Sequence, residues 1–206
     1  MKVNKQLINI PKILNLLVIL LPLTFIFGSL FINLQLILIS VFGIVLYKKD
    51  LFLINKDKIL FYFSIFFFFL ILTSLIDYYF NYENSSLLKS FLFLRYFIFL
   101  LVVYQMVIKE HLNFKLFFIG CLIITLFISI DIIYQFLNYK NIFGFIKTRY
   151  HSTGVFNQEA IAGGYIQRFG LFALFALSFV FYKQKKILFF STTLILTIFI
   201  SAILFS

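Results

Sequence analysis

The sequence contains few of the residues that bind metals, form disulfides or carry charge. Of its 206 residues only 12% are charged, and it has 1 Cys, 2 His, 2 Pro and no Trp. The single cysteine, Cys121, excludes a disulfide within the chain. The two histidines, His111 and His151, stand far apart in the sequence without an accompanying carboxylate cluster. We therefore predict no metal site.

Motifs for nucleotides and signs of domain division are also missing. The sequence has no P-loop, and we expect no cofactor. No segment rich in Pro, Gly or Ser divides it, and no pattern recurs with a period of about 20–50 residues. We therefore expect residues 1–206 to form a single transmembrane domain.

Apolar residues make up most of the chain. It is 63% hydrophobic and 22% aromatic, with 33 Phe, and its mean hydropathy is +1.08. A water-soluble globule of this composition could not cover its surface with polar groups. The composition predicts an integral membrane protein in which many phenylalanines face lipid.

Long apolar runs predict an all-α, polytopic transmembrane helical bundle of about seven spans. The runs cover residues 13–29, 32–47, 59–76, 90–108, 114–137, 159–182 and 187–206. Pro22 lies inside the first run and Gly28 at its end, so the first two runs are expected to form a kinked hairpin. The first run is too long for a signal peptide, and we interpret it as a retained helix.

The distribution of basic residues predicts a cytoplasmic N-terminus. With that orientation the outer segments hold Lys89, Lys140, Lys147 and Arg149, while the more numerous remaining flanking lysines lie inside. Residues 138–158 then form an outer loop. The net charge of +11 is explained by topology and by contact with anionic lipid, and no nucleic-acid partner is expected.

Several polar residues lie within the predicted spans. Arg95 stands near the limit of snorkelling from the outer end of the fourth span, so a surface position and a cavity position both remain open. Asp131, with Gln135 one helical turn away, is too short to snorkel and predicts a polar cavity or a cationic partner. Arg168, about 13 Å of helical rise from Glu159, is expected to face protein or water.

The span after the outer loop is predicted to begin near Asn157. Asn157 is a suitable N-cap, and Glu159 in the first turn would favour the positive end of the helix dipole. Glu159 shares one side of this helix with Gly163, Gly170 and Ala173. Small residues on one side predict close packing of a neighbouring helix.

The opposite side of the same helix carries Tyr165 and Arg168, one turn apart. We expect these two side chains to project together into a cavity that opens toward the outer face.

An ordered set of short motifs resembles a known family. The motifs are Leu94-Arg95-Tyr96, Asp131-Ile-Ile-Tyr-Gln135-Phe, Asn141-Ile-Phe-Gly144-Phe and the segment from His151 to Arg168. Together, over roughly residues 87–175, they resemble the bacterial O-antigen ligase and O-antigen polymerase family of polytopic membrane glycan transferases.

The resemblance implies a membrane glycosyltransferase of lipopolysaccharide biosynthesis, located as a multi-pass protein in the bacterial cell (inner) membrane. It would transfer a glycan from an undecaprenyl-pyrophosphate carrier to an acceptor glycan or lipid A-core at the periplasmic face. Guanidinium groups suit a departing pyrophosphate. The implied carrier-binding residues are Arg149, Arg168, Arg95 and His151, supported by Asp131, Gln135, Gly154, Glu159 and Tyr165.

The sequence departs from the family at two points. His151 stands where relatives often have arginine, so Arg149 or a cationic His151 takes the phosphate contact, the site is impaired, or His151 is an ordinary interfacial histidine. The family's presumed basic histidine belongs to a later outer loop, so no catalytic residue is assigned. From the apolar segment 187–206 we expect the N-terminal portion of a longer O-antigen ligase-like protein or a truncated product, and enzymatic activity of these residues alone stays open.

Two other classes of protein fit the same residues. A small transporter or flippase-like protein would use Arg95, Asp131 and Arg168 along a polar path between the two faces. These groups gather toward the outer half, which disfavours such a path. A non-enzymatic membrane subunit would use every charge for packing or topology.

Overall fold

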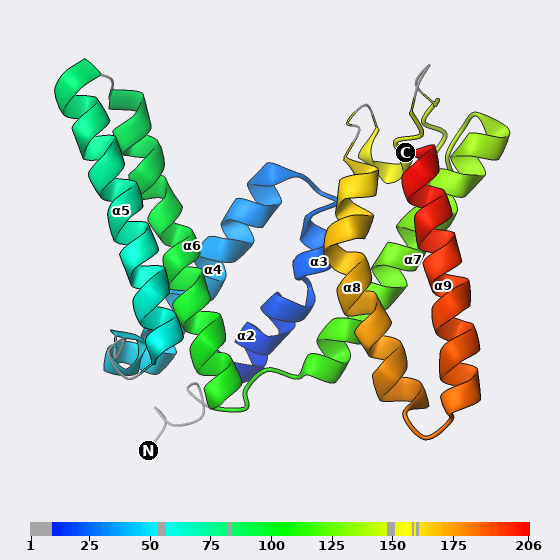
Figure 1. Ribbon diagram of the computed structural model, residues 1–206, viewed down its shortest axis with the longest axis horizontal. Helices are drawn as coiled ribbons and strands as arrows, with labels where there is room; N and C mark the ends of the chain where they lie inside the picture. The colour runs from blue at the N-terminus through cyan, green and yellow to red at the C-terminus, as the bar shows by residue number, and fades with distance from the viewer. Residues whose placement is uncertain (1–9, 53–56, 82–83, 148–150, 158, 160) are drawn as a thin grey trace. The chain divides into compact units, whose positions relative to one another are not determined.

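The computed structural model describes residues 10–52, 57–81, 84–147, 151–157, 159 and 161–206, and these residues are almost entirely helical (Figure 1). The α-helices are α2 (Ile10–Ile19), α3 (Leu21–Thr24), α4 (Ser29–Tyr47), α5 (Lys58–Asn81), α6 (Asn84–Ile108), α7 (Phe114–Asn138), α8 (Ala162–Phe181) and α9 (Lys185–Phe205). Two short 3-10 helices are η1 (Lys48–Phe52) and η3 (Gly154–Phe156).

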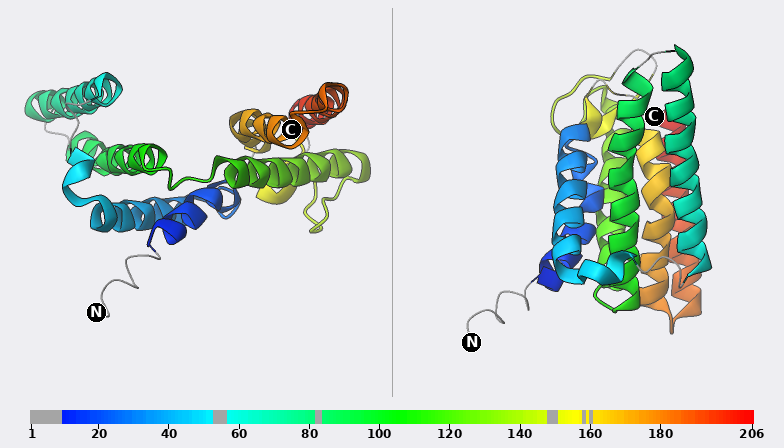
Figure 2. Two further views of the ribbon diagram at one scale, coloured as in Figure 1. Left: turned by 90° about the horizontal axis from the view of Figure 1, so that it is seen from below. Right: turned by 90° about the vertical axis from the view of Figure 1, so that its left-hand side faces the viewer.

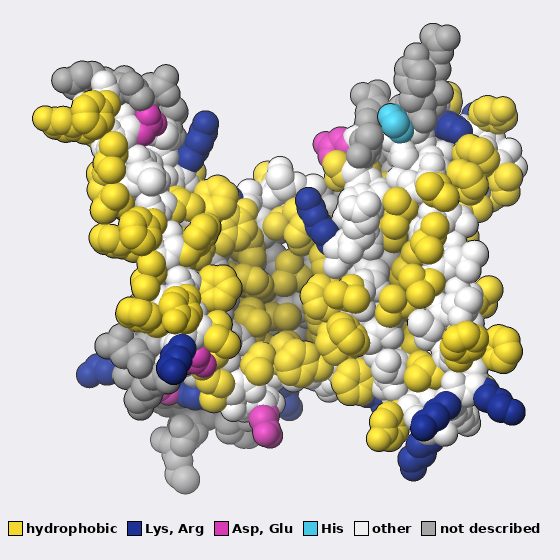
Figure 3. Space-filling view, viewed as in Figure 1, with side chains coloured by type: hydrophobic (Ala, Val, Ile, Leu, Met, Phe, Trp, Pro, Cys, Tyr) yellow, Lys and Arg dark blue, Asp and Glu magenta, His cyan; other side chains and the backbone are white. Residues whose placement is uncertain are grey.

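Within the described residues, six helices, α4 to α9, are long and apolar enough to cross a membrane. Their apolar stretches of 20–25 residues match the roughly 30 Å of hydrocarbon that a helix must span. Hydrophobic side chains cover the flanks of the helices on the face drawn in Figure 3, and most Lys and Arg side chains visible there lie near helix ends. The chain is therefore a multi-pass, all-α membrane protein.

The first predicted span, residues 13–29, is not one continuous helix. It is divided into α2 and α3 at Leu20, directly before Pro22. Proline lacks a backbone N–H and its ring clashes with the preceding turn, so the helix cannot continue through it unbroken. The described part of α2 has 10 residues, about half the length that a crossing requires.

The described chain separates into two compact units. One unit contains residues 1–18 and 29–112, and the other contains residues 19–28 and 113–206. We describe each unit by itself, and we use "outer" for the ends of helices on the membrane side predicted to hold residues 138–158.

In the first unit, α4 and α5 pack against α6. Gly43 of α4 lies so close to α6 that a Cβ atom placed there would be 2.2 Å from the Val102 side chain. Between α5 and α6, the Ser74 hydroxyl donates to the Ser90 hydroxyl at 2.5 Å, and the rings of Phe67 and Phe97 lie 5.0 Å apart. Small and hydroxylated residues thus allow close approach where lipid supplies no hydrophobic drive.

The second unit is a bundle of α7, α8 and α9 with α3 packed against it. Its buried core includes Cys121, Ile128, Ala173 and Phe199. The predicted small-residue side of α8 is confirmed, since Gly163, Gly170 and Ala173 are all buried. A Cβ atom at Gly170 would meet the Phe199 ring of α9 at 3.2 Å. The two views of Figure 2 show α8 and α9 running alongside each other.

The predicted start of α8 is wrong. The helix begins at Ala162 rather than near Asn157, and Asn157 instead ends η3 with φ 58°. Glu159 therefore lies before the helix and not in its first turn. Its backbone N–H donates to the Phe156 carbonyl, which makes this stretch a tight turn that precedes the helix.

Candidate functional site: the outer loop between α7 and α8

The chain turns back on itself where α7 ends. Tyr139, with φ 61°, terminates the helix, and an isolated antiparallel bridge then pairs Lys140 with Ile146. The Lys147 N–H donates to the Tyr139 carbonyl at 2.8 Å. We call residues 139–147 the α7 hairpin.

Asp131 of α7 is fully buried beneath this hairpin. Its Oδ1 accepts from the Ile142 backbone N–H at 2.9 Å, and its Oδ2 accepts from the Asn141 side-chain amide at 3.3 Å. Within the described residues, the hydrogen-bond partners of this carboxylate are thus a side-chain amide and a backbone N–H from the hairpin. The sequence predicted a polar cavity or a cationic partner, and in the described part of the chain the carboxylate is enclosed by polar groups of the loop.

Asn141 is the centre of the buried network. Its side-chain oxygen accepts from the backbone N–H groups of Phe143 and Phe145 at 3.0 and 2.7 Å. Its side-chain nitrogen donates to the Gly154 carbonyl at 2.8 Å in addition to Asp131. One buried amide therefore fixes the turn of the hairpin and joins it to the segment before η3.

Gln135 makes the second connection between α7 and the loop. Its amide nitrogen donates to the Phe145 carbonyl at 3.2 Å, and its oxygen accepts from the Gly154 N–H at 2.8 Å. Gly154 has φ +56°, and a Cβ atom there would stand 3.2 Å from Asp131 Oδ2. Both the backbone conformation and the close approach favour glycine.

Three of the predicted supporting residues, Asp131, Gln135 and Gly154, are thus brought together, with Asn141 between them. Sequence reasoning included Asn141 only within a family motif and gave it no role. The feature of the sequence that could have identified Asn141 is the occurrence of polar side chains at Asp131, Gln135 and Asn141, near the end of an apolar helix.

Tyr165, predicted to face a cavity together with Arg168, is buried instead. It is 4% exposed, its ring packs against Phe156 and Phe169, and its hydroxyl donates to the Pro22 carbonyl at 2.8 Å. The broken helix at Pro22 leaves backbone groups that need partners, and Tyr165 satisfies one of them.

Arg168 is exposed on α8, so the prediction that it shares a cavity with Tyr165 is wrong. Successive residues on a helix diverge by about 100°, and residues three apart differ by about 60°, which suffices to separate a core position from a surface one. Because α8 begins at Ala162, Arg168 lies about 9 Å of rise from its outer end. Arg168 lies outside the core of its own unit, and the expectation that it faces protein or water stays a prediction.

The remaining outer-loop candidates differ in what the structure describes. Arg149 lies outside the described residues. His151 is exposed, and its Nδ1 lies 2.9 Å from the Ser206 carbonyl oxygen. Glu159 is also exposed. Next to His151, Ser152 and Thr153 are buried, and neither hydroxyl has a hydrogen-bond partner within the described part of the chain.

Arg95 belongs to the first unit, on α6. It is partly buried, its guanidinium lies 4.9 Å from the centre of the Tyr96 ring, and its Nη2 donates to the Tyr96 hydroxyl at 3.3 Å. Because α6 begins at Asn84 rather than at residue 90, Arg95 is about 16 Å from the helix end. The helix therefore continues farther beyond Arg95 than the predicted span, which began at residue 90.

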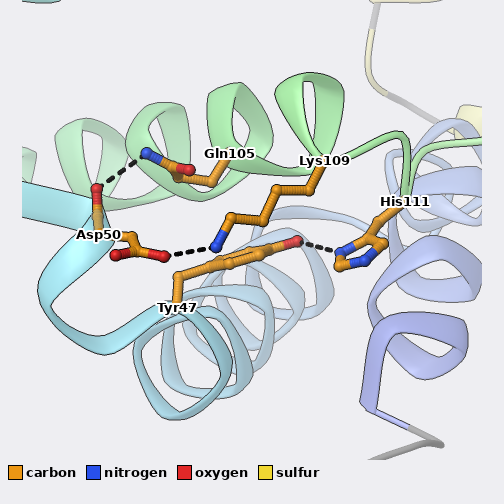
Figure 4. Close-up of polar contacts among 5 residues, drawn as sticks. All are labelled: Tyr47, Asp50, Gln105, Lys109 and His111. Atoms are coloured by element: carbon orange, nitrogen blue, oxygen red, sulfur yellow. Dashed lines mark hydrogen bonds and ion pairs between the residues drawn. The ribbon is translucent and has the colours of Figure 1, made fainter. Parts of the chain in front are cut away.

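At the opposite end of the first unit, a polar cluster joins η1 to the end of α6 (Figure 4). Lys109 Nζ lies 2.5 Å from Asp50 Oδ2 and 5.1 Å from the centre of the Tyr47 ring. The Tyr47 hydroxyl is 2.9 Å from His111 Nδ1, and Gln105 donates to the Asp50 carbonyl at 2.8 Å. The ion pair is partly exposed, so it contributes little stabilisation by itself. Together, the contacts of the cluster connect η1 to the end of α6.

Comparison with known proteins gives no assignment. No family model matches the chain, and no curated protein and no solved structure matches it either. The chemistry of the outer loop must therefore be argued from its own residues and from the motif resemblance.

Proposed function

We propose that the protein is an O-antigen ligase-like membrane glycosyltransferase, or the carrier-binding part of one. It would transfer a glycan from an undecaprenyl-pyrophosphate carrier to an acceptor at the periplasmic face of the inner membrane. The observation that carries the proposal is that motif residues from separate segments, Asp131, Gln135, Asn141 and Gly154, form one buried network. A fully connected network of this kind gives the motif segments one rigid arrangement, as a binding loop requires.

In this proposal the network positions the loop, and the cations bind the diphosphate. Asp131 and Gln135 are fully buried and hydrogen-bonded within the loop, so they fix Ile142, Phe145 and Gly154, which precede and follow Arg149 and His151 in the sequence. Arg168 is exposed on the following helix and available to an anion. Bidentate guanidinium contacts would stabilise negative charge on the departing pyrophosphate.

The proposal is tested by binding of undecaprenyl pyrophosphate to the protein in nanodiscs. We expect the single substitutions Arg149→Ala and Arg168→Ala each to weaken binding about tenfold, as for loss of one charge-assisted contact. The control is Lys89→Ala, an exposed cation on α6, which should change binding less than twofold. Equal affinity of all variants, or no preference of the unmodified protein for the diphosphate over phosphatidylglycerol, would contradict the proposal.

A non-enzymatic membrane subunit is the second candidate. Asp131 accepts hydrogen bonds from Asn141 and Ile142 of the same chain. A structural role alone explains its burial, and this favours the non-enzymatic subunit. The binding experiment separates the two candidates, because a subunit of this kind would show no diphosphate preference.

A further inference from the structure

The α7 hairpin runs back along its own helix instead of outward into water. Its base, Tyr139 and Lys147, lies at the end of α7. Toward the tip of the hairpin, the Ile142 N–H donates to Asp131. Asp131 is about 10 Å of helical rise from the end of α7. The ring of Phe143 lies 6.3 Å from the ring of Phe127. Phe127 itself is about 16 Å of helical rise from the end of α7.

This geometry places the tip at hydrocarbon depth. α7 has 25 residues, or about 37 Å of rise, against a hydrocarbon thickness of about 30 Å. Even with all the excess length on the outer side, Phe127 would lie about 9 Å below the hydrocarbon boundary. The contact with Phe143 draws the tip of the hairpin toward that level.

The backbone N–H groups of the hairpin have partners within the protein. An unpaired backbone group costs several kcal/mol in hydrocarbon, so irregular backbone near that depth needs such partners. Every backbone N–H from Asn141 to Phe145 has an acceptor in the hairpin or in Asp131. The buried network therefore satisfies the backbone donors of the hairpin without water.

The side chains of the hairpin follow the polarity of a membrane interface. At the tip, Ile142 is 53% and Phe143 61% exposed. At the base stand Lys140, Lys147 and Tyr139, and Lys147 Nζ lies 4.1 Å from the centre of the Phe136 ring. In Figure 2 (left) the yellow-green loop after α7 lies on the side of that helix away from α8 and α9, which leaves the tip uncovered within its unit.

We infer that the α7 hairpin is a membrane-inserted loop. Its tip at Ile142 and Phe143 contacts the acyl chains of the adjoining leaflet, and Lys140 and Lys147 at its base contact anionic lipid phosphates. This inference is independent of the proposed glycan transfer, because it depends only on the depth and polarity of the hairpin.

Fluorescence quenching at single cysteines tests the inference. The background is Cys121→Ala, and the protein is placed in nanodiscs containing phosphatidylethanolamine and phosphatidylglycerol. A nitrobenzoxadiazole label at Phe143→Cys should be quenched by lipid carrying a doxyl group on the upper acyl chain and protected from iodide. The lipid-facing control is Ile130→Cys on α7, 52% exposed, and the aqueous control is His151→Cys, an exposed loop residue.

The outcomes separate the possible neighbours of the tip. Quenching at residue 143 that resembles residue 130 supports insertion, and iodide access equal to that at residue 151 overturns it. Protection from both quenchers also overturns it, because protein would then cover the tip. Adding Asn141→Ala to the Phe143→Cys protein should raise iodide quenching at least twofold, since the hairpin loses the contacts that hold it along α7.

Discussion

At the outer end of α7, one amide side chain replaces several backbone partners. Asn141 is 3% exposed and uses both its oxygen and its nitrogen in hydrogen bonds to the hairpin, to Gly154 and to Asp131. In a region with little water each of these groups would otherwise be unsatisfied. Polar residues in this apolar chain therefore have a structural role that does not depend on catalysis.

The substitution Asn141→Ala tests this role. It leaves the N–H groups of Phe143 and Phe145 and the carboxylate of Asp131 short of partners, so we expect about 3 kcal/mol of destabilisation. The control is Asn138→Ala, because Asn138 is exposed and bonds only to its own helix at Tyr134. Unfolding in a detergent titration measures both variants, and equal midpoints would contradict the assigned role.

Tyr165 gives a second prediction at the scale of a single atom. Replacing it by phenylalanine removes only the hydroxyl and leaves the Pro22 carbonyl without its buried donor. We expect Tyr165→Phe to lower the free energy of unfolding by about 1–2 kcal/mol. Tyr182→Phe is the matched control, since Tyr182 is 79% exposed and should change stability by less than about 0.5 kcal/mol.

The candidate site could be predicted from the sequence only in part. The polar residues Asp131 and Gln135 stand out in an apolar helix, and their association with the following loop was foreseeable. The roles of Tyr165 and Arg168 were not, because the choice between core and surface depends on where α8 begins and which helices pack against it. Lys109 was counted only among the flanking lysines and Asp50 was given no role, because the partners in their polar cluster come from distant segments.

At the scale of elements, the contact between α4 and α6 depends on one missing side chain. A Cβ atom at Gly43 would overlap the Val102 side chain at 2.2 Å. We predict that Gly43→Ala destabilises the protein by about 1–3 kcal/mol through overpacking. Gly164→Ala is the control, because nothing lies within 4 Å of a Cβ atom there and alanine favours the helix. Thermal unfolding of both variants in detergent gives the comparison.

The start of α5 gives a prediction about pH. Asp57 accepts from the Ile59 N–H at 2.8 Å and from the Tyr104 hydroxyl. The Tyr104 hydrogen bond, followed by that of Ile59, lowers the pKa of Asp57 below its ordinary value, against a smaller opposing effect of desolvation. Because the folded pKa is the lower one, this contribution to stability is complete above about pH 3.9 and is lost as pH falls through the folded pKa.

A titration of the Ile59 amide by NMR measures this effect. We expect its resonance to shift with a midpoint below about pH 3.9. In Asp57→Asn, which keeps an acceptor oxygen but does not titrate, the shift should disappear. A midpoint above that of a free aspartate would contradict the hydrogen-bonding arrangement.

Most helices were predictable because an apolar run of about 20 residues has few alternatives in a membrane protein. The prediction failed where local chemistry changes the backbone. Pro22 divides the first run into α2 and α3, and the turn at Asn157 delays α8. The start of α6 at Asn84 was missed because polar residues end an apolar run without ending a helix.

At the scale of the whole molecule, the six long helices fix which connections share a membrane side. Each crossing reverses the direction of the chain, so the connections after α4, α6 and α8 lie on one side and those after α5 and α7 on the other. The side that receives Lys183, Lys185 and Lys186 is the richer in lysine. By the tendency of positive residues to remain in the cytoplasm, that side is predicted to face inward.

Cysteine labelling in intact cells tests the orientation. On the Cys121→Ala background, Lys140→Cys should react with a membrane-impermeant maleimide in whole cells, because it lies in the connection after α7. Lys183→Cys, in the connection after α8, should react only after lysis. Both lysines are exposed, so accessibility within the protein is matched and the membrane alone decides the result. The reverse pattern would invert the topology and would place the α7 hairpin and the proposed carrier-binding cations on the cytoplasmic side.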